Sequence, residues 1–174
     1  MLYMFIEGTD DEKFFKSLIN SSPLDIKFIK YANERKEKID NWIKSIDSIN
    51  DYDYVFLGDA DDNTIMTRKK ELCDTYKRLS KEKLYIVKKE IESWYYAGIN
   101  KSKCDELKLK KYEFYTNEIT KEDFISKINK KSERGIILSQ IIDNYDISLA
   151  ITRNESLCEF YEKFLKNILL CKKI

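Results

Sequence analysis

Acidic side chains cluster in short segments that directly follow runs of apolar residues. The clearest segment is F-L-G-D-A-D-D-N at 56–63, where three carboxylates fall within four positions after an apolar run. Glu7 follows the first apolar run of the chain in the same way, and Glu90 and Glu92 follow a later one. Carboxylate oxygens are the ligands that Mg²⁺ and Mn²⁺ prefer, so this spacing indicates divalent-cation chemistry.

Electrostatic repulsion supports the same interpretation. Two unit charges ~4 Å apart repel by roughly 4 kcal/mol at an effective dielectric constant near 20. Several uncompensated carboxylates would therefore use a large share of the stability of a domain, and a divalent cation removes that cost. The chain has no histidine, and its four cysteines form no C-x-x-C pair, which disfavours zinc. The candidate metal ligands are Glu7, Asp11, Asp59, Asp61, Glu90 and Glu92.

The elements that would position these acids follow from the apolar periodicity. Short apolar runs predict strands, and these lie at 2–6, 26–31, 52–57 and 84–87. Apolar residues at helical spacing predict helices between them, at 11–19, 34–49 and 65–79. Strands that alternate with helices predict an α/β fold with a parallel sheet between helices. Ligands bind at the carboxyl ends of such strands, so the acidic segments would converge on one edge of the sheet.

The pattern changes after residue 98. Thr120 followed by Asp123 is typical of a helix start, and helices are expected at about 121–130, 133–144 and 154–170. A short strand is expected at Tyr112–Tyr115. We therefore predict an α/β domain at residues 1–98 and a mainly helical extension at 99–174 that packs on it.

Charge is distributed unevenly along the chain. Residues 1–63 contain 8 basic and 14 acidic side chains, net −6, whereas residues 64–174 contain 24 and 17, net +7. This asymmetry suits an acid-lined site that handles a polyanion through a cation, with lysine and arginine holding the phosphates. We expect a nucleic acid, DNA or RNA, as the partner. The candidate phosphate-binding residues are Lys88, Lys89, Lys131 and Arg134.

Composition also excludes several classes of protein. The absence of histidine removes Ser-His and Cys-His nucleophilic catalysis, which leaves carboxylates, lysine, tyrosine or a metal ion. The amino terminus M-L-Y-M-F-I-E-G lacks the basic region of a signal peptide, and no apolar run approaches the ~20 residues of a membrane span. We therefore expect a cytoplasmic protein without a membrane partner.

Other known loops match the segment at 56–63 less well. A calcium-binding EF-hand loop needs glycine where Thr64 stands and glutamate where Lys70 stands. The aspartyl nucleophile loop of dehalogenases needs threonine or valine in place of Asn63. The glycine-rich phosphate loops are absent from the chain. A solvated turn that caps the next helix is the structural alternative, and we assign the capping role to Asp62.

Structural roles also exist for the remaining acids. Asp10, Asp11 and Glu12 fit the start of a helix, and Asp11 alone among them is kept as a candidate ligand. Glu90 and Glu92 fit the first turn of a helix, where carboxylates interact favourably with the helix dipole.

Four segments of the chain carry a family resemblance. F-I-E-G-T-D-D-E-K-F-F at 5–15 and D-A-D at 59–61 resemble the motifs of the TOPRIM fold, which topoisomerases, bacterial primases and several nucleases share. E-I-E-S-W-Y at 90–95 and the segment 154–164 are similar to the OLD-nuclease branch and its small relatives. The resemblance covers about the first 98 residues. The ATPase region of full-length OLD proteins, the topoisomerase tyrosine domain and the primase zinc module have no counterpart.

The resemblance implies a Rossmann-like TOPRIM domain that acts as a metal-dependent nuclease. It implies that Asp59, Asp61 and either Glu90 or Glu92 hold one or two Mg²⁺ or Mn²⁺ ions. Glu7 would be a ligand or the general acid/base, so the implied catalytic set is Glu7, Asp59, Asp61 and Glu90. A partner ATPase and a role in phage defence are suggested by the resemblance alone.

Two other classes of function stay open. One is a non-catalytic module that binds Mg²⁺ and nucleic acid and acts with a partner protein. The other is a receiver-like phosphotransfer domain, in which Asp59 is phosphorylated and Lys88 is the accompanying lysine. The sequence leaves the choice of DNA or RNA, the number of metal ions and the oligomeric state open.

Overall fold

The computed structural model describes residues 1–19, 24–166 and 168. The described residues divide into two compact units, residues 1–87 with residue 168, and residues 88–166. This division falls earlier than the expected boundary at residue 98, because helix α4 (Ile91–Ala97) packs against later helices of the chain.

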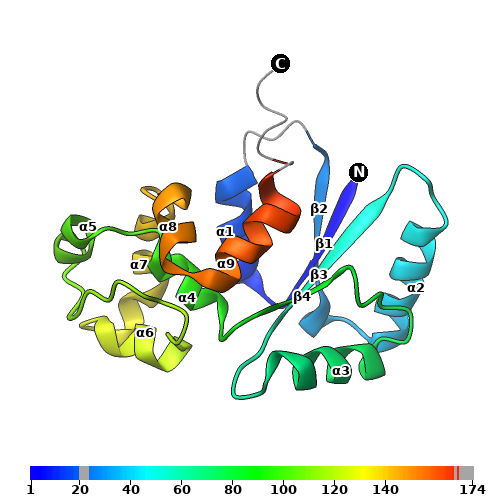
Figure 1. Cartoon of the computed structure of the whole chain (residues 1–174), viewed down its shortest axis with the longest axis horizontal. Helices are drawn as coiled ribbons and strands as arrows, with labels where there is room; N and C mark the ends of the chain where they lie inside the picture. The colour runs from blue at the N-terminus through cyan, green and yellow to red at the C-terminus, as the bar shows by residue number, and fades with distance from the viewer. Residues whose placement is uncertain (20–23, 167, 169–174) are drawn as a thin grey trace. The chain divides into compact units, whose positions relative to one another are not determined.

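The first unit is built on a four-stranded parallel sheet with the strand order β2-β1-β3-β4. The strands are β1 (Leu2–Ile6), β2 (Ile26–Lys30), β3 (Asp53–Asp59) and β4 (Leu84–Val87). The predicted α/β fold with a four-stranded parallel sheet is confirmed, and β1 and β4 have the predicted bounds. Figure 1 shows the four strands side by side.

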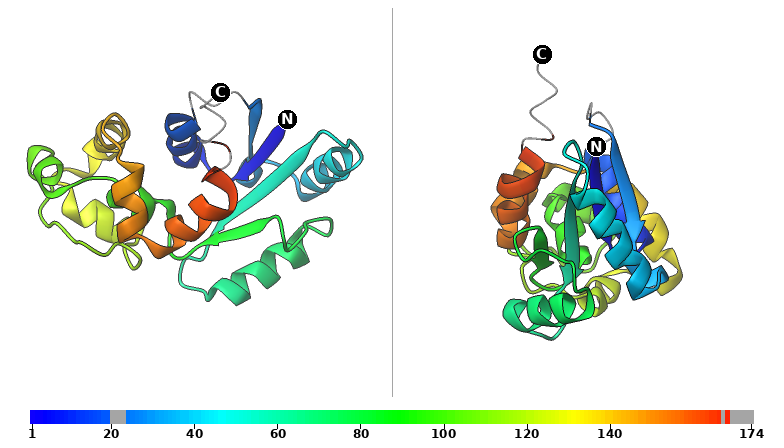
Figure 2. Two further views of the ribbon diagram at one scale, coloured as in Figure 1. Left: turned by 45° about the horizontal axis from the view of Figure 1, so that its top comes forward. Right: turned by 90° about the vertical axis from the view of Figure 1, so that its right-hand side faces the viewer.

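Three helices cover the two faces of this sheet. They are α1 (Thr9–Ile19), α2 (Lys36–Asp47) and α3 (Ile65–Thr75). Helix α1 lies on one face, and α2 and α3 lie on the other (Figure 2). The core beneath α2 and α3 contains stacked rings, with the Tyr31 and Phe56 centroids 4.5 Å apart and those of Phe5 and Phe56 5.5 Å apart. Burial on both faces explains why the strands are nearly continuous apolar runs in the sequence.

The chain leaves the two central strands in opposite directions. Strand β1 continues into α1 on one face, whereas its neighbour β3 continues into α3 on the other. This is the topological switch point of a doubly wound sheet, the position at which sheets of this kind bind their ligands. Glu7 and Gly8 directly follow β1, and Asp59 is the last residue of β3.

The second unit is mainly helical, as predicted. After α4 it contains α5 (Lys101–Glu106), α6 (Lys121–Lys127), α7 (Arg134–Ile142), α8 (Ile147–Arg153), α9 (Glu155–Phe160) and a π-helical turn (Tyr161–Leu165). The predicted start of α6 is confirmed, because Thr120 and Asp123 form a reciprocal capping box. None of the helices in the described part of the chain is long and apolar enough to cross a membrane.

One prediction for the second unit is wrong, and another is incomplete. Residues 112–115 form an irregular loop rather than a strand, because the buried Arg153 side chain binds the backbone carbonyls of Glu113 and Phe114. The helix expected at about 154–170 is present as α9 from Glu155 and the π-helical turn that ends at Leu165, but it follows a separate helix, α8, that the sequence did not predict. Residues 167, 169 and 170 of that prediction lie outside the described residues.

Candidate acidic site at the sheet edge

The carboxyl edge of the first unit carries three of the predicted acids. Glu7 and Asp61 are exposed, and Asp59 is half-buried. Strands β1 and β3 are hydrogen-bonded neighbours that run parallel, so the residues that follow them lie at the same edge. This edge therefore presents carboxylates to solvent at the switch point of the sheet.

The buried Tyr31 interacts electrostatically with the acids at this edge. Tyr31 is the first residue after β2, and its hydroxyl donates a hydrogen bond to Oε2 of Glu7 at 3.4 Å. Burial raises the pKa of Tyr31 well above its ordinary value, the negative charges of Glu7, Asp59 and Asp11 raise it further, and Arg68 partly opposes them. Four charged side chains therefore act on one phenol, which places them in the same small region.

Arg68 is the cation of this region, and the sequence arguments did not single it out. Its Nε donates to the backbone carbonyl of Asp59 at 2.9 Å, and its guanidinium lies 4.0 Å from Oδ2 of Asp61 and 3.4 Å from Oε2 of Glu71. Its side chain is 23% exposed, so it can still reach a ligand. The available signal was its position in the first turns of the helix after the acidic loop. Tyr31 had a similar signal, as the first residue past a strand.

The loop between β3 and α3 differs from the prediction at its helix cap. Thr64, not Asp62, caps α3, because its side-chain oxygen accepts the Thr67 N–H at 3.1 Å. Asp61 adopts a left-handed backbone conformation with φ 51°. Gly58 has a packing role, since a Cβ there would lie 2.6 Å from Cδ1 of Leu72 on α3.

Asp11 is engaged at the start of α1. Its Oδ2 accepts the backbone N–H of Gly8 at 2.7 Å, and the residue is only 8% exposed. This contact supports the helix-start role that the sequence left as an alternative. Its charge nevertheless acts on Tyr31, so Asp11 contributes to the negative potential of the edge.

Glu90 and Glu92 belong to the second unit and contact other groups there. Glu92 is 3% exposed and forms an ion pair with Arg134. Glu90 precedes α4, and its Oε2 accepts the backbone N–H of Lys121. Glu92, a predicted metal ligand, and Arg134, a predicted phosphate-binding residue, thus neutralise each other.

The remaining predicted phosphate-binding residues lie in the same unit. Lys88 pairs with Glu118 at 2.7 Å, which raises the pKa of Lys88 and lowers that of Glu118. Lys89 is half-buried and adds to the positive potential at Glu118. Lys131 is exposed in a short 3-10 turn (Lys131–Glu133). Their role in binding phosphate stays a prediction.

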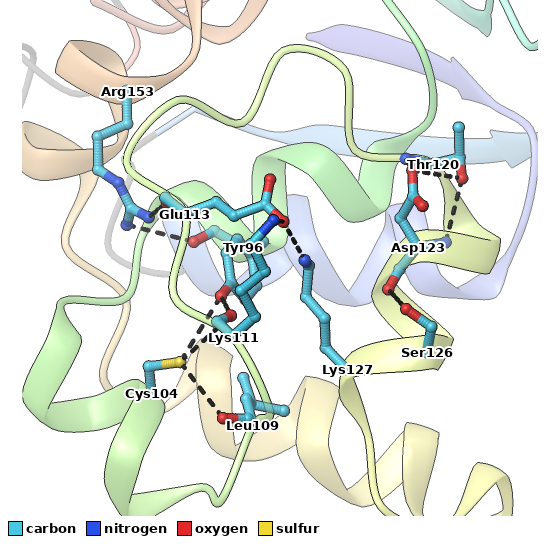
Figure 3. A network of polar contacts seen from close by, with 10 residues as sticks. All are labelled: Tyr96, Cys104, Leu109, Lys111, Glu113, Thr120, Asp123, Ser126, Lys127 and Arg153. Atoms are coloured by element: carbon cyan, nitrogen blue, oxygen red, sulfur yellow. Dashed lines mark hydrogen bonds and ion pairs between the residues drawn. The ribbon is translucent and has the colours of Figure 1, made fainter.

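The sequence analysis did not single out Arg153, a buried cation of the second unit that makes several hydrogen bonds. Arg153 is 1% exposed, and its guanidinium donates only to backbone carbonyls. These belong to Tyr96, Ala97, Ile99, Glu113 and Phe114. The neighbouring Lys127 is also buried and forms an ion pair with the Glu113 carboxylate (Figure 3). Full hydrogen bonding of a buried cation indicates a structural role.

Comparison with known proteins does not assign the chain to a family. The chain matches no protein-family model, no curated protein and no solved structure. The functional interpretation therefore depends on the chemistry of the sheet edge.

The edge acids have the donor chemistry that Mg²⁺ and Mn²⁺ require. Within residues 1–19, 24–166 and 168, no three acid, cysteine or histidine side chains are grouped so that they could hold a metal ion. Mg²⁺, however, is commonly bound by one or two carboxylates, with waters and substrate phosphates completing its shell. One or two of Glu7, Asp59 and Asp61 have the chemistry to bind an ion whose shell the substrate completes, and the three do not form a closed protein cage.

Proposed function

We propose that this protein is a divalent-cation-dependent nuclease that hydrolyses phosphodiester bonds of DNA or RNA at a TOPRIM-type site. One observation carries the proposal: Glu7 follows β1, Asp59 ends the neighbouring strand β3 and Asp61 follows it, at the switch point of the parallel sheet. Ligands of doubly wound sheets bind at this position. A phosphodiester is the substrate class that suits carboxylates and a hard cation together.

The residues of the first unit supply a role for each part of the reaction. Asp59 and Asp61 would hold Mg²⁺ or Mn²⁺, which when bound stabilises negative charge on the phosphate and the leaving oxygen. Glu7 is positioned by the Tyr31 hydroxyl and would accept the proton of the attacking water. Arg68, held by the Asp59 carbonyl, would donate to phosphate oxygens.

Conservative substitutions at the edge test the proposal. In Asp59→Asn and Glu7→Gln, the cleavage rate of DNA or RNA in the presence of Mn²⁺ or Mg²⁺ should fall by at least about a hundredfold. Asp62→Asn is the matched control, because Asp62 is an exposed acid of the same loop with the same charge change. Asp62→Asn should cleave at the wild-type rate. A chelator should abolish cleavage by the wild type and by each variant.

Other outcomes of the same experiments would contradict the nuclease proposal. Intact single- and double-stranded DNA and RNA, together with no heat of Mg²⁺ or Mn²⁺ binding in calorimetry, would refute the proposal. Binding of cation and nucleic acid without cleavage would instead favour a non-catalytic module that acts with a partner protein such as an ATPase.

A further inference from the structure

A groove of about 730 Å³ lies in the first unit, between α2 and the outer strand β2 of the sheet. Tyr3 and Ile29 line it from the sheet, Trp42 and Ile46 line it from α2, and Tyr52 lines it from the residues before β3. Its volume is that of an ordinary ligand pocket, and its walls are mostly aromatic or aliphatic.

The groove results from the way the chain crosses the sheet. Helix α2 connects β2 to β3 and buries Ile39, Ile43 and Ile46, packing against β3. The part of this face near the edge strand β2 is left incompletely covered. Partly buried apolar side chains remain there, among them Tyr3 and Trp42, which pack on the margin of the core.

Lysine ammonium groups lie over aromatic rings in the groove and beside it. The ring centroids of Tyr3 and Tyr52 are 5.7 Å apart at an interplanar angle of 50°. Nζ of Lys27 lies 5.9 Å from the Tyr3 centroid, and Nζ of Lys38 lies 4.7 Å from that of Trp42. Rings on which bases stack, with cations beside them for the backbone, are the elements with which proteins bind single-stranded nucleic acid.

The charges of the groove also favour a polyanion. Lys27 and Lys30 line it, and Lys30 is paired with Glu12 at 3.1 Å. The lining carboxylate Glu34 is paired with Lys38 at 2.8 Å, so the exposed Lys27 is the cation that the groove offers to a phosphate. Lysines on an edge strand oppose pairing with a second copy of that strand, because the copies would bring like charges together. A ligand with phosphates meets no such penalty.

We propose that this groove binds an unpaired segment of single-stranded nucleic acid. Its bases stack on Tyr3, Tyr52 and Trp42, and its phosphates contact Lys27. The groove reaches the carboxyl end of β2, where Lys30 directly precedes Tyr31, the residue that contacts Glu7. The inference rests on the proposed function for the identity of the ligand, and it specifies an unpaired strand as the substrate delivered to the acidic edge.

Tryptophan fluorescence provides the test, because the chain has two tryptophans and only Trp42 lines the groove. Wild type and Trp42→Phe are titrated with a short oligothymidylate in the presence of EDTA, so that binding is measured without cleavage. The oligonucleotide should quench the wild type and leave Trp42→Phe, which retains the buried Trp94, unquenched. A duplex of the same length and a free mononucleotide should both bind more weakly.

Two variants with matched controls locate the site. Tyr3→Ala and Lys27→Glu should each weaken oligonucleotide binding roughly tenfold, and Lys27→Glu should also reduce its salt dependence. Tyr115→Ala and Lys77→Glu make the same changes at exposed positions outside the groove and should bind like wild type. Circular dichroism checks that each variant is folded. Lys27 is exposed and carries the test if Tyr3→Ala does not fold.

Three results would overturn the inference. They are no quenching by the oligonucleotide, unchanged affinity in Lys27→Glu, and equal or stronger quenching by an acidic peptide. A protein that cleaves but shows no quenching would refute the groove and leave the proposed function standing. A protein that binds in the groove but cleaves no substrate would support the groove and refute the nuclease.

Discussion

The two units of the chain use charged side chains in opposite ways. At the sheet edge of the first unit, Glu7 and Asp61 are exposed, and Arg68 is the cation beside them. In the second unit, Arg153 and Glu92 are almost completely buried, and each contacts groups of opposite charge or polarity. Buried charge that is fully bonded stabilises a fold, whereas acids gathered at an open edge are available to a ligand.

Burial changes what the loss of a charge does. Removing one partner of a buried interaction leaves the other desolvated and unpaired, which is costly. Removing one of several neighbouring acids at a surface relieves repulsion and leaves no buried group behind. The comparison therefore predicts large losses of stability in the second unit and losses of activity without instability at the edge of the first.

The largest expected effect is at Arg153. Arg153→Ala should lower the free energy of unfolding of the second unit by about 3–5 kcal/mol, because several backbone carbonyls lose their donor. Arg153→Lys should also destabilise it, since a single ammonium group cannot replace the planar fork of the guanidinium. Urea unfolding in a Trp42→Phe background measures this, because Trp94 then reports on the second unit alone.

Lys101→Ala is the matched control for Arg153, as it removes an exposed cation of the same unit. The free energy of unfolding of Lys101→Ala should stay within about 0.5 kcal/mol of the wild-type value. An unchanged free energy of unfolding in Arg153→Ala would contradict the distinction between the two units. It would show that burial and hydrogen bonding of this cation do not stabilise the second unit.

The next effect concerns Glu92 and Arg134. Glu92→Gln should cost about 1.5–3 kcal/mol of stability, because it weakens a charged hydrogen bond to Arg134 inside the unit. Arg134→Gln should cost a similar amount, and the double variant should cost less than the sum of the two. Urea unfolding of the four proteins, with Trp94 as the reporter, gives this coupling.

The same variants decide between a structural Glu92 and a metal ligand. If Glu92 holds a divalent ion, Glu92→Gln should abolish the calorimetric signal of Mg²⁺ or Mn²⁺ binding, and the double-variant coupling should be near zero. Strong coupling with intact metal binding would place Glu92 among the structural ions, together with Arg153.

A smaller, pH-dependent effect is expected at Glu113. The hydrogen bond from Lys127, and a second from Lys111, lower the pKa of the Glu113 carboxyl below its ordinary value of 4.5. A lowered folded-state pKa stabilises the protein above the unfolded pKa, and this contribution is lost as the pH falls through the folded pKa. Glu113→Gln should therefore be about 1 kcal/mol less stable near neutrality, and the difference should disappear in acid.

Acid titration of urea stability measures the contribution of Glu113. Glu106→Gln is its control, because Glu106 pairs with Lys103 in the same unit but its side chain is 67% exposed. That variant should differ little from the wild type at any pH. A difference at Glu113 that persists unchanged in acid would show that the Glu113 interaction does not depend on its charge.

The first unit was predictable from its sequence because local patterns decide it. A parallel sheet buried on both faces needs short continuous apolar runs, and those at 2–6 and 84–87 match strands β1 and β4 without error. The order of elements then placed Glu7 and Asp59 at one edge. Tyr31 and Arg68 escaped notice, since their contacts with that edge depend on side chains brought together through space.

The second unit was less predictable because contacts distant in sequence decide its local structure. Residues 112–115 are aromatic-rich like a strand, but Arg153 binds their carbonyls. Asn154 separates α8 from α9, and its side chain caps α9 while also donating to Thr116. The burial of Glu92 likewise follows from the packing of α4, which its position after a strand does not reveal.

The smallest expected effect on stability is at Asp61, the edge counterpart of Glu92. Asp61→Asn should leave the free energy of unfolding within about 0.5 kcal/mol of the wild type, because an exposed charge is lost and asparagine tolerates the left-handed conformation at φ 51°. Asp61→Ala removes the same charge but should cost about 1 kcal/mol through backbone strain. Scanning calorimetry separates charge from strain in this pair. If Asp61→Asn were as destabilising as Glu92→Gln, the acids of the edge would belong to the scaffold, and the distinction between the two units would fail.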